Sequence, residues 1–156
     1  MSEKILHVEP WAPHTHDIAQ DFIGKIHAVA PELEVLFMGA AALGLPGKND
    51  IDLDILCSKE DIVAYTQKLL PILGTPKDTN DHLAAWEFQY EGFEIDIILS
   101  DPSMSHVPEQ QSVFEKLKTE PILLKEYSEL KQACDGLPYT IYENRKKAFF
   151  KRLLNQ

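Results

Sequence analysis

Three aspartates stand at alternate positions in the segment DIDLDILC, at Asp50, Asp52 and Asp54, with isoleucine or leucine between them. This spacing predicts a strand with one apolar face and one face of carboxylates. Carboxylates two residues apart lie roughly 6–7 Å apart, so each charge raises the pKa of its neighbour. Mg²⁺ or Mn²⁺ binds such hard oxygens together with phosphate and water. Asp96, on another predicted strand, would complete a metal site of the kind that supports in-line displacement at phosphorus.

Two other interpretations of the acidic strand stay open at this level. A row of acids on an alternating strand is also typical of a sheet face that simply contacts water. The acids at 50, 52 and 54 also match the first ligand positions of a calcium-binding loop, but Ile55 occupies the glycine position and Asp61 replaces the final glutamate.

Candidate phosphate ligands lie before and after the acidic strand. Gly39 follows a predicted strand and precedes a short predicted helix, where open backbone and N–H groups favour an anion. Lys48 lies in the turn LPGKN. Three lysines of the C-terminal region can line a triphosphate site or can belong to a solvated helix face: Lys131, Lys146 and Lys147. His82 precedes a predicted strand that can approach the acids.

The elements that must position these residues follow from hydrophobic periodicity and from glycine and proline. We expect helices at about 16–30, 40–43, 59–70, 113–118, 121–134 and 139–154, and strands at 34–38, 50–57, 83–90 and 93–99. Glu91-Gly92 predicts a hairpin turn between the last two strands. Ser58 is expected to cap the helix after it, residues 74–81 to form a loop, and the alternating aromatic residues from 86 to 90 to lie in the core.

Composition limits the fold and the partners. The 156 residues carry a net charge of −10 and only two cysteines, Cys57 and Cys134. We therefore expect one domain over 1–156, with 106–156 as its helical C-terminal part, reduced thiols and a cytoplasmic protein without a secretory signal or a membrane span. The acidic balance argues against non-specific nucleic-acid binding. The order of elements predicts an α/β (α+β) fold, a small mixed sheet flanked by helices with a helical C-terminal extension.

The residues Met38-Gly39, a turn, alternating aspartates and a later strand aspartate resemble the polymerase-β-like nucleotidyltransferase superfamily. The stretch GLPGKNDIDLDI and the C-terminal segments TEPILLKEYSELK and IYENRKKAFF are similar to the GrpB family of that fold. The resemblance implies that Gly39 and Ala40 pack against nucleotide phosphates, and that Asp52, Asp54 and Asp96 are the catalytic, metal-binding acids. A second register, from SDIDL in minimal nucleotidyltransferases against NDIDL here, would use Asp50 and Asp52; we predict the first.

The resemblance has two departures. Ala40 stands where the superfamily usually has glycine or serine, so a hydrogen bond to phosphate worth about 1 kcal/mol is missing. The turn is also one residue shorter than the GrpB pattern. The resemblance implies a Mg²⁺- or Mn²⁺-dependent enzyme that moves a nucleoside monophosphate from an NTP to an unidentified hydroxyl acceptor. The alternatives are a weakly active or inactive nucleotide-binding or interaction module on the same fold, and a nuclease-like or hydrolase-like use of the same acids.

Overall fold

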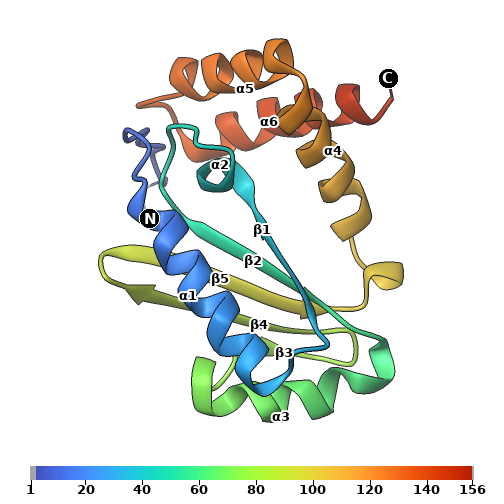
Figure 1. Cartoon of the computed structure of the whole chain (residues 1–156). Helices are drawn as coiled ribbons and strands as arrows, with labels where there is room; N and C mark the ends of the chain where they lie inside the picture. Colours follow the sequence, from blue (N-terminus) through green and yellow to red (C-terminus); the bar gives the residue numbers. More distant parts are fainter. Residues whose placement is uncertain (1–2, 156) are drawn as a thin grey trace.

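A five-stranded mixed sheet is the centre of the computed structural model, which describes residues 3–155. The strand order is β1-β2-β5-β4-β3, and β2 and β5 are parallel while the other neighbouring pairs are antiparallel. The strands are β1 (Glu34–Met38), β2 (Ile51–Leu56), β3 (Asp78–Thr79), β4 (Leu83–Tyr90) and β5 (Phe93–Ser100). A mixed α/β fold, with helices flanking a small mixed sheet, is therefore confirmed (Figure 1).

Helices α1 (His14–Val29) and α3 (Ile62–Leu73) cover one face of this sheet, as Figure 1 shows. The apolar residues of the alternating strands point to that side because side chains alternate between faces. Ile51, Leu53 and Ile55 are fully buried there against Ile18 of α1 and Leu69 of α3. The carboxylates of β2 consequently point to the opposite face.

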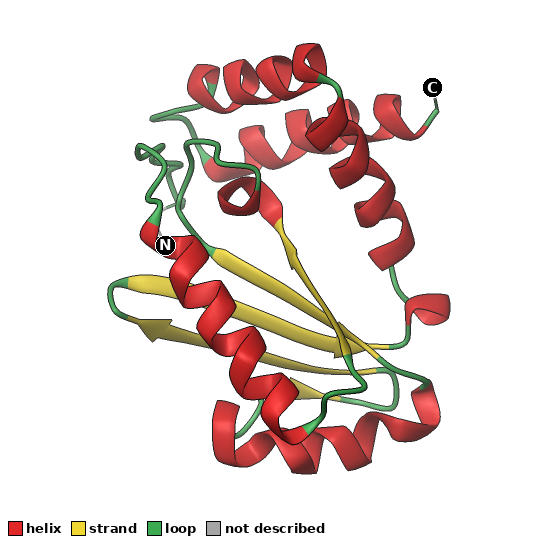
Figure 2. Ribbon diagram, viewed as in Figure 1, coloured by secondary structure: helices red, strands yellow, loops and turns green. Residues whose placement is uncertain are grey.

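The other helices gather at one end of the molecule (Figure 2). They are α2 (Gly39–Ala42), α4 (Val107–Thr119), α5 (Pro121–Ala133) and α6 (Tyr139–Leu154). Leu117, Leu123, Tyr127 and Phe149 form a second apolar cluster, which Leu45 joins from the loop after α2. This cluster holds the C-terminal helices beside the turn that leads into β2.

Several local predictions are confirmed and others are wrong. The hairpin of β4 and β5 turns at Glu91-Gly92 with positive φ angles of 49° and 84°, and Trp86 is 2% exposed in the core. The helix predicted at 113–118 begins six residues earlier, because Pro108 is tolerated in a first helical turn. Ser58 donates and accepts no side-chain cap bond: a short 3-10 turn (Lys59–Asp61) precedes α3. The expected loop at 74–81 contains β3.

None of the helices among residues 3–155 combines the length and the apolar character that a bilayer crossing requires.

Candidate functional site

The acidic residues of β2 and β5 lie side by side because these strands pair in parallel. The register places Asp52 directly opposite Asp96 and Asp54 opposite Ile98. One carboxylate oxygen from each of Asp50, Glu94 and Asp96 lies within 4.8 Å of the others. The strand β2 runs without a turn through Asp52 and Asp54, and this excludes the calcium-loop interpretation, since that ligand set requires a turn.

Burial and mutual repulsion raise the pKa values of these acids. The pKa of Asp52 rises to about 7, first through burial and then through the charges of Asp50 and Asp54. The pKa of Asp96 also rises to about 7, through burial and then through Glu94 and Asp52. Burial raises the pKa of Asp54 to about 6. The face is therefore not a row of freely solvated acids, and a cation placed among them would lower the free energy of their charged forms.

Gly39 begins α2 directly beside Asp52. Its φ of 85° is one that side chains rarely adopt, and a Cβ atom built on it would lie 2.5 Å from Oδ2 of Asp52. Glycine at this position therefore lets the backbone between β1 and α2 approach the acidic strand.

A cleft of about 550 Å³ separates the acidic face from the C-terminal helices. Its floor includes Asp50, Asp52, Asp54, Glu87, Glu94, Asp96 and Ile98. The rest is lined by Lys4 and Leu6 of the N-terminal segment, by Met38 of β1, and by residues of α2, the following loop and α4–α6. The helical C-terminal part thus forms a wall over the carboxylates, so the interpretation of a sheet face that simply contacts bulk water does not hold here.

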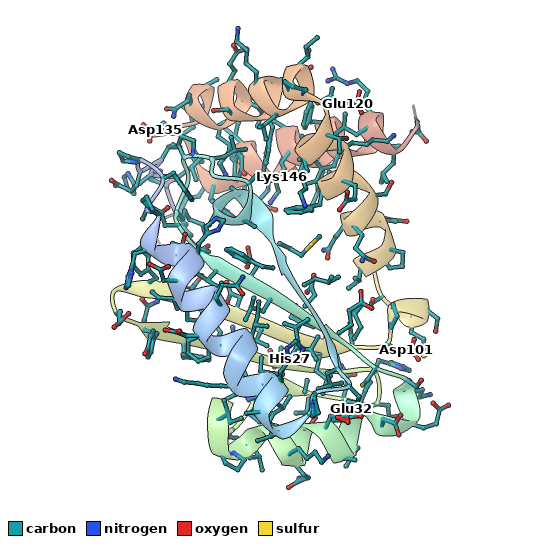
Figure 3. The ribbon with its side chains drawn as sticks, in the orientation of Figure 1. His27, Glu32, Asp101, Glu120, Asp135 and Lys146 are labelled. Atoms are coloured by element: carbon teal, nitrogen blue, oxygen red, sulfur yellow. The ribbon has the colours of Figure 1, made fainter. Side chains whose placement is uncertain are left out.

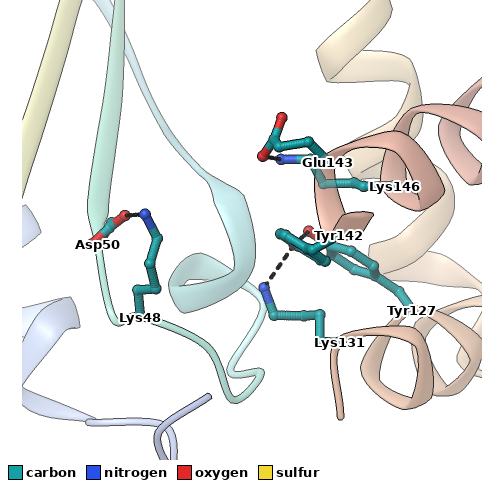
Figure 4. A network of polar contacts seen from close by, with 7 residues as sticks. All are labelled: Lys48, Asp50, Tyr127, Lys131, Tyr142, Glu143 and Lys146. Carbon is teal, nitrogen blue, oxygen red and sulfur yellow. Dashed lines mark hydrogen bonds and ion pairs between the residues drawn. The ribbon is translucent and has the colours of Figure 1, made fainter. Parts of the chain in front are cut away.

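Lys131 is the central basic residue of that wall, and it is only 6% exposed. Its Nζ donates to the hydroxyl of Tyr142 at 3.1 Å and lies 5.2 Å from the ring centroid of Tyr127 (Figure 4). Burial, and then the charges of Lys146 and Lys48, lower its pKa to about 8. A Cβ atom on Gly47 would meet Nζ of Lys131 at 3.0 Å, so the loop glycine leaves room for this side chain.

Two more lysines stand near it, each already paired with an acid. Nζ of Lys48 lies 3.1 Å from Asp50, and Nζ of Lys146 lies 3.1 Å from Glu143 (Figure 4). Burial alone would lower the pKa of Lys48, but the charge and hydrogen bond of Asp50 outweigh it and raise the pKa above its ordinary value. Figure 3 shows Lys146 on α6, far from Asp101, the residue that follows β5.

The structure brings most of the residues predicted from sequence into one cleft. The predicted phosphate ligands that line it are Gly39, Ala40, Lys48, Lys131 and Lys146, and the predicted acids that line it are Asp50, Asp52, Asp54 and Asp96. Lys147 and His82 are exposed and are absent from its lining.

Sequence reasoning missed Glu94 and the tyrosines around the lysines. Glu94 stands two residues before Asp96 in the alternating segment FEIDII, so the same periodicity that selected Asp96 places Glu94 on the acidic face. Nothing in a local pattern points to Tyr127 or Tyr142, because their position depends on the packing of α5 against α6.

The donor chemistry of the cleft fits a hard divalent cation. Its converging atoms are all carboxylate oxygens, which Mg²⁺ and Mn²⁺ prefer, and neither histidine nor cysteine belongs to the cluster. Asp50, Asp96 and Glu94 would hold such an ion, with Asp52 next to them. Lysines on the other wall would face its negatively charged ligand.

Comparisons with known proteins give only a distant likeness. No protein-family model and no curated protein sequence matches the chain. A structure of Cid1, described by its RNA terminal uridylyl transferase activity, is 16% identical with a TM-score of 0.45, over 80% of this chain and 44% of that chain. A cytoplasmic RNA terminal U-transferase is 18% identical with a TM-score of 0.46, over 76% and 40%.

A third solved structure, Cid1 poly(U) polymerase with MgGTP bound, is 15% identical with a TM-score of 0.43, over 80% of this chain and 45% of that one. The chain therefore spans less than half the length of these three proteins. Similarity at this level concerns the arrangement of the backbone alone, and the chemistry has to be argued from the cleft itself.

Proposed function

We propose that the chain is a metal-dependent nucleotidyltransferase that moves a nucleoside monophosphate from an NTP to a hydroxyl acceptor. One observation carries the proposal: carboxylates of two parallel strands converge on the floor of a cleft whose opposite wall holds buried and half-buried lysines. A triphosphate with its divalent cation has the charge pattern that satisfies both walls at once.

The reaction assigns a role to each group of residues. The acceptor oxygen forms a bond to the α-phosphorus, the bond from that phosphorus to the bridging oxygen breaks, and pyrophosphate leaves. Asp96 orients the acceptor hydroxyl and takes its proton, while Lys48, Lys131 and Lys146 bind the phosphates that leave. Mg²⁺ bound by the acids would neutralise the triphosphate and stabilise the charge that develops in the transition state.

For the strand pair that binds metal we favour Asp50 and Asp52, the second of the two registers. Asp50 belongs to the carboxylate cluster and Asp52 lies opposite Asp96, which supports this choice. Asp54, predicted above as a metal ligand, lies opposite Ile98 instead. Gly39 and Ala40 remain proposed neighbours of the phosphates, on the basis of their place beside Asp52 and in the cleft lining.

A thermal-shift titration with ATP, with and without Mg²⁺, tests the site. Ligand at 100 times its Kd stabilises the folded state by about 2.7 kcal/mol. We expect a Mg²⁺-dependent shift that Asp50→Asn and Lys131→Met abolish and that Glu87→Gln retains, because Glu87 lines the same cleft but is paired with Lys77. Pyrophosphate release across NTPs and acceptors then tests turnover. A shift that survives Asp50→Asn, Asp52→Asn and Asp96→Asn alike would refute the metal assignment.

A weakly active or inactive nucleotide-binding module is the second candidate, and Ala40 favours it. Its side chain offers no hydroxyl to a phosphate at the start of α2. Ala40→Ser separates the two functions: pyrophosphate release that appears only in this variant favours the module, and release by the natural chain favours the enzyme. Membership of the GrpB family and a cytoplasmic location are part of the proposal.

A further inference from the structure

Asp54 is a buried carboxylate that the proposed metal site does not use. Its side chain lines the cleft, yet the residue is only 7% exposed. Among residues 3–155, no hydrogen bond or ion pair to its carboxylate is found. Among the described residues, its carboxylate oxygens do not belong to the fully enclosed, unpartnered atoms, so they stay open to the cleft, where a ligand group can supply the partner.

The cross-strand neighbours of Asp54 are apolar: Leu36 of β1 on one side and Ile98 of β5 on the other. Ile98 lies opposite it across β2 and β5 and is 39% exposed, although it is a large hydrophobic residue. Phe114 and Val113 of α4 line the same cleft. A ligand that reaches Asp54 therefore needs an apolar body as well as a hydrogen-bond donor or a positive charge.

The basic residues of the cleft belong to a different region. Lys48 pairs with Asp50, which precedes Asp54 by four positions and so lies roughly 13 Å away along the strand. No ion pair between a lysine and Asp54 is found among the described residues, whereas Lys48 and Lys146 each have an acidic partner elsewhere.

In-line displacement determines which reactant approaches from the side of Asp54. The leaving pyrophosphate lies by the lysines, and the attacking group must enter opposite to it. We propose that the Asp54 end of the cleft binds the acceptor, and that the acceptor is a small organic cation, with an ammonium group on an apolar body. This inference rests on the proposed function, since the order of reactants follows from phosphoryl transfer.

Charge also separates this acceptor from a nucleic acid strand. Asp54 lines the cleft without an ion-pair partner, and the chain as a whole carries a net charge of −10. A polyanion approaching this carboxylate would meet repulsion, whereas an ammonium group is attracted and pairs with Asp54.

Binding of simple probes tests the assignment without any turnover. Calorimetric titration compares 2-phenylethylammonium, neutral 2-phenylethanol and anionic phenylacetate, with Mg²⁺ present and nucleotide absent. We expect saturable binding of the ammonium probe alone, weakened about tenfold or more by Asp54→Asn, since a hydrogen bond to a charged group contributes about 1.5–3 kcal/mol. Glu87→Gln is the matched control and leaves the affinity within about twofold.

A second variant guards against a folding artefact. Ile98→Lys changes a partly exposed residue and places a tethered ammonium beside Asp54, so it should abolish probe binding. Equal binding of the alcohol, an affinity that Asp54→Asn leaves unchanged, displacement of the probe by ATP, or no saturable ammonium binding would each overturn the proposal. None of these results depends on the ATP thermal shift, so the proposed function can fail or stand separately.

Discussion

Replacement of Lys131 by methionine should stabilise the protein at neutral pH, although it removes a residue of the proposed phosphate site. The lysine is buried between Tyr127 and Tyr142, and its pKa falls from its ordinary value of 10.5 to about 8. Below pH 8 it is charged in both the folded and the unfolded state, so the folded state carries the full cost of burying the charge. Above pH 10.5 it is neutral in both states and this cost is absent.

The size of the effect follows from this shift in pKa. At pH 7 the cost is about 3 kcal/mol, because each pKa unit corresponds to 1.36 kcal/mol. Methionine also loses the hydrogen bond to Tyr142, worth about 1 kcal/mol. We therefore expect Lys131→Met to be more stable than the natural chain by about 2 kcal/mol at pH 7, and this advantage to fall by about 2 kcal/mol by pH 9.5.

Urea denaturation of both proteins at pH 7 and pH 9.5 measures the difference. Taking the difference cancels the titration of the shared groups that do not interact with Lys131. The groups that face Lys131 are Tyr127, Tyr142, Lys48 and Lys146, with Asp50 and Asp52 acting at longer range. Lys125→Met changes an exposed lysine of the same helix and should show no pH-dependent difference. A Lys131→Met protein that is less stable at pH 7, or a difference that does not change with pH, would refute the reasoning.

Three further substitutions test the packing and charge of the site. Gly39→Ala should destabilise the fold by about 1–2 kcal/mol and displace Asp52, because of its φ of 85° and a Cβ contact of 2.5 Å; unchanged urea unfolding would contradict this. Phe149→Ala should lower the free energy of unfolding by about 3–5 kcal/mol, since the ring is buried and stacks on Tyr127. A decrease below about 1 kcal/mol would show that this ring contributes little to the packing of the second apolar cluster. Asp96→Asn should raise the melting temperature of the ligand-free protein, because one of the mutually repelling carboxylates is neutralised. The same variant should abolish the Mg²⁺-dependent thermal shift with ATP. A lower melting temperature of the ligand-free variant would mean that the charge of Asp96 stabilises the fold.

Period-two alternation was sufficient to predict much of the sheet. It identified the apolar face of β2, the acidic face and the core position of Trp86, because each depends only on side-chain direction along one strand. The turn at Glu91-Gly92 was predictable because Gly92 readily accepts a positive φ angle and stands between two alternating segments, although glutamate is uncommon at the φ of 49° that Glu91 adopts. Such features are encoded within about ten residues.

Strand pairing and the helical wall depend on longer-range packing. A local sequence pattern does not predict that β2 pairs with β5 in parallel. Asp50 and Glu94 could therefore be assigned to the acidic face of their own segments, but not to positions beside each other. Likewise, the lowered pKa of Lys131 follows from burial and then from the charges of Lys146 and Lys48, which lie on other segments of the chain. The residue types of the cleft were predictable, but their contacts required the tertiary fold.

The charges of the cleft favour one class of ligand over a merely structural role. Burial and repulsion raise the pKa values of Asp52 and Asp96, while burial and neighbouring lysines lower that of Lys131. Both shifts mean that the charged forms of these side chains are less stable in the folded protein than in water. The carboxylates and the ammonium group of Lys131 nevertheless line a common cleft and could have been packed as ion pairs. A fold optimised for stability alone would pair or replace them. A divalent cation beside the acids and a polyphosphate beside the lysines relieve both costs together, and this is the charge pattern of a metal-bound nucleotide.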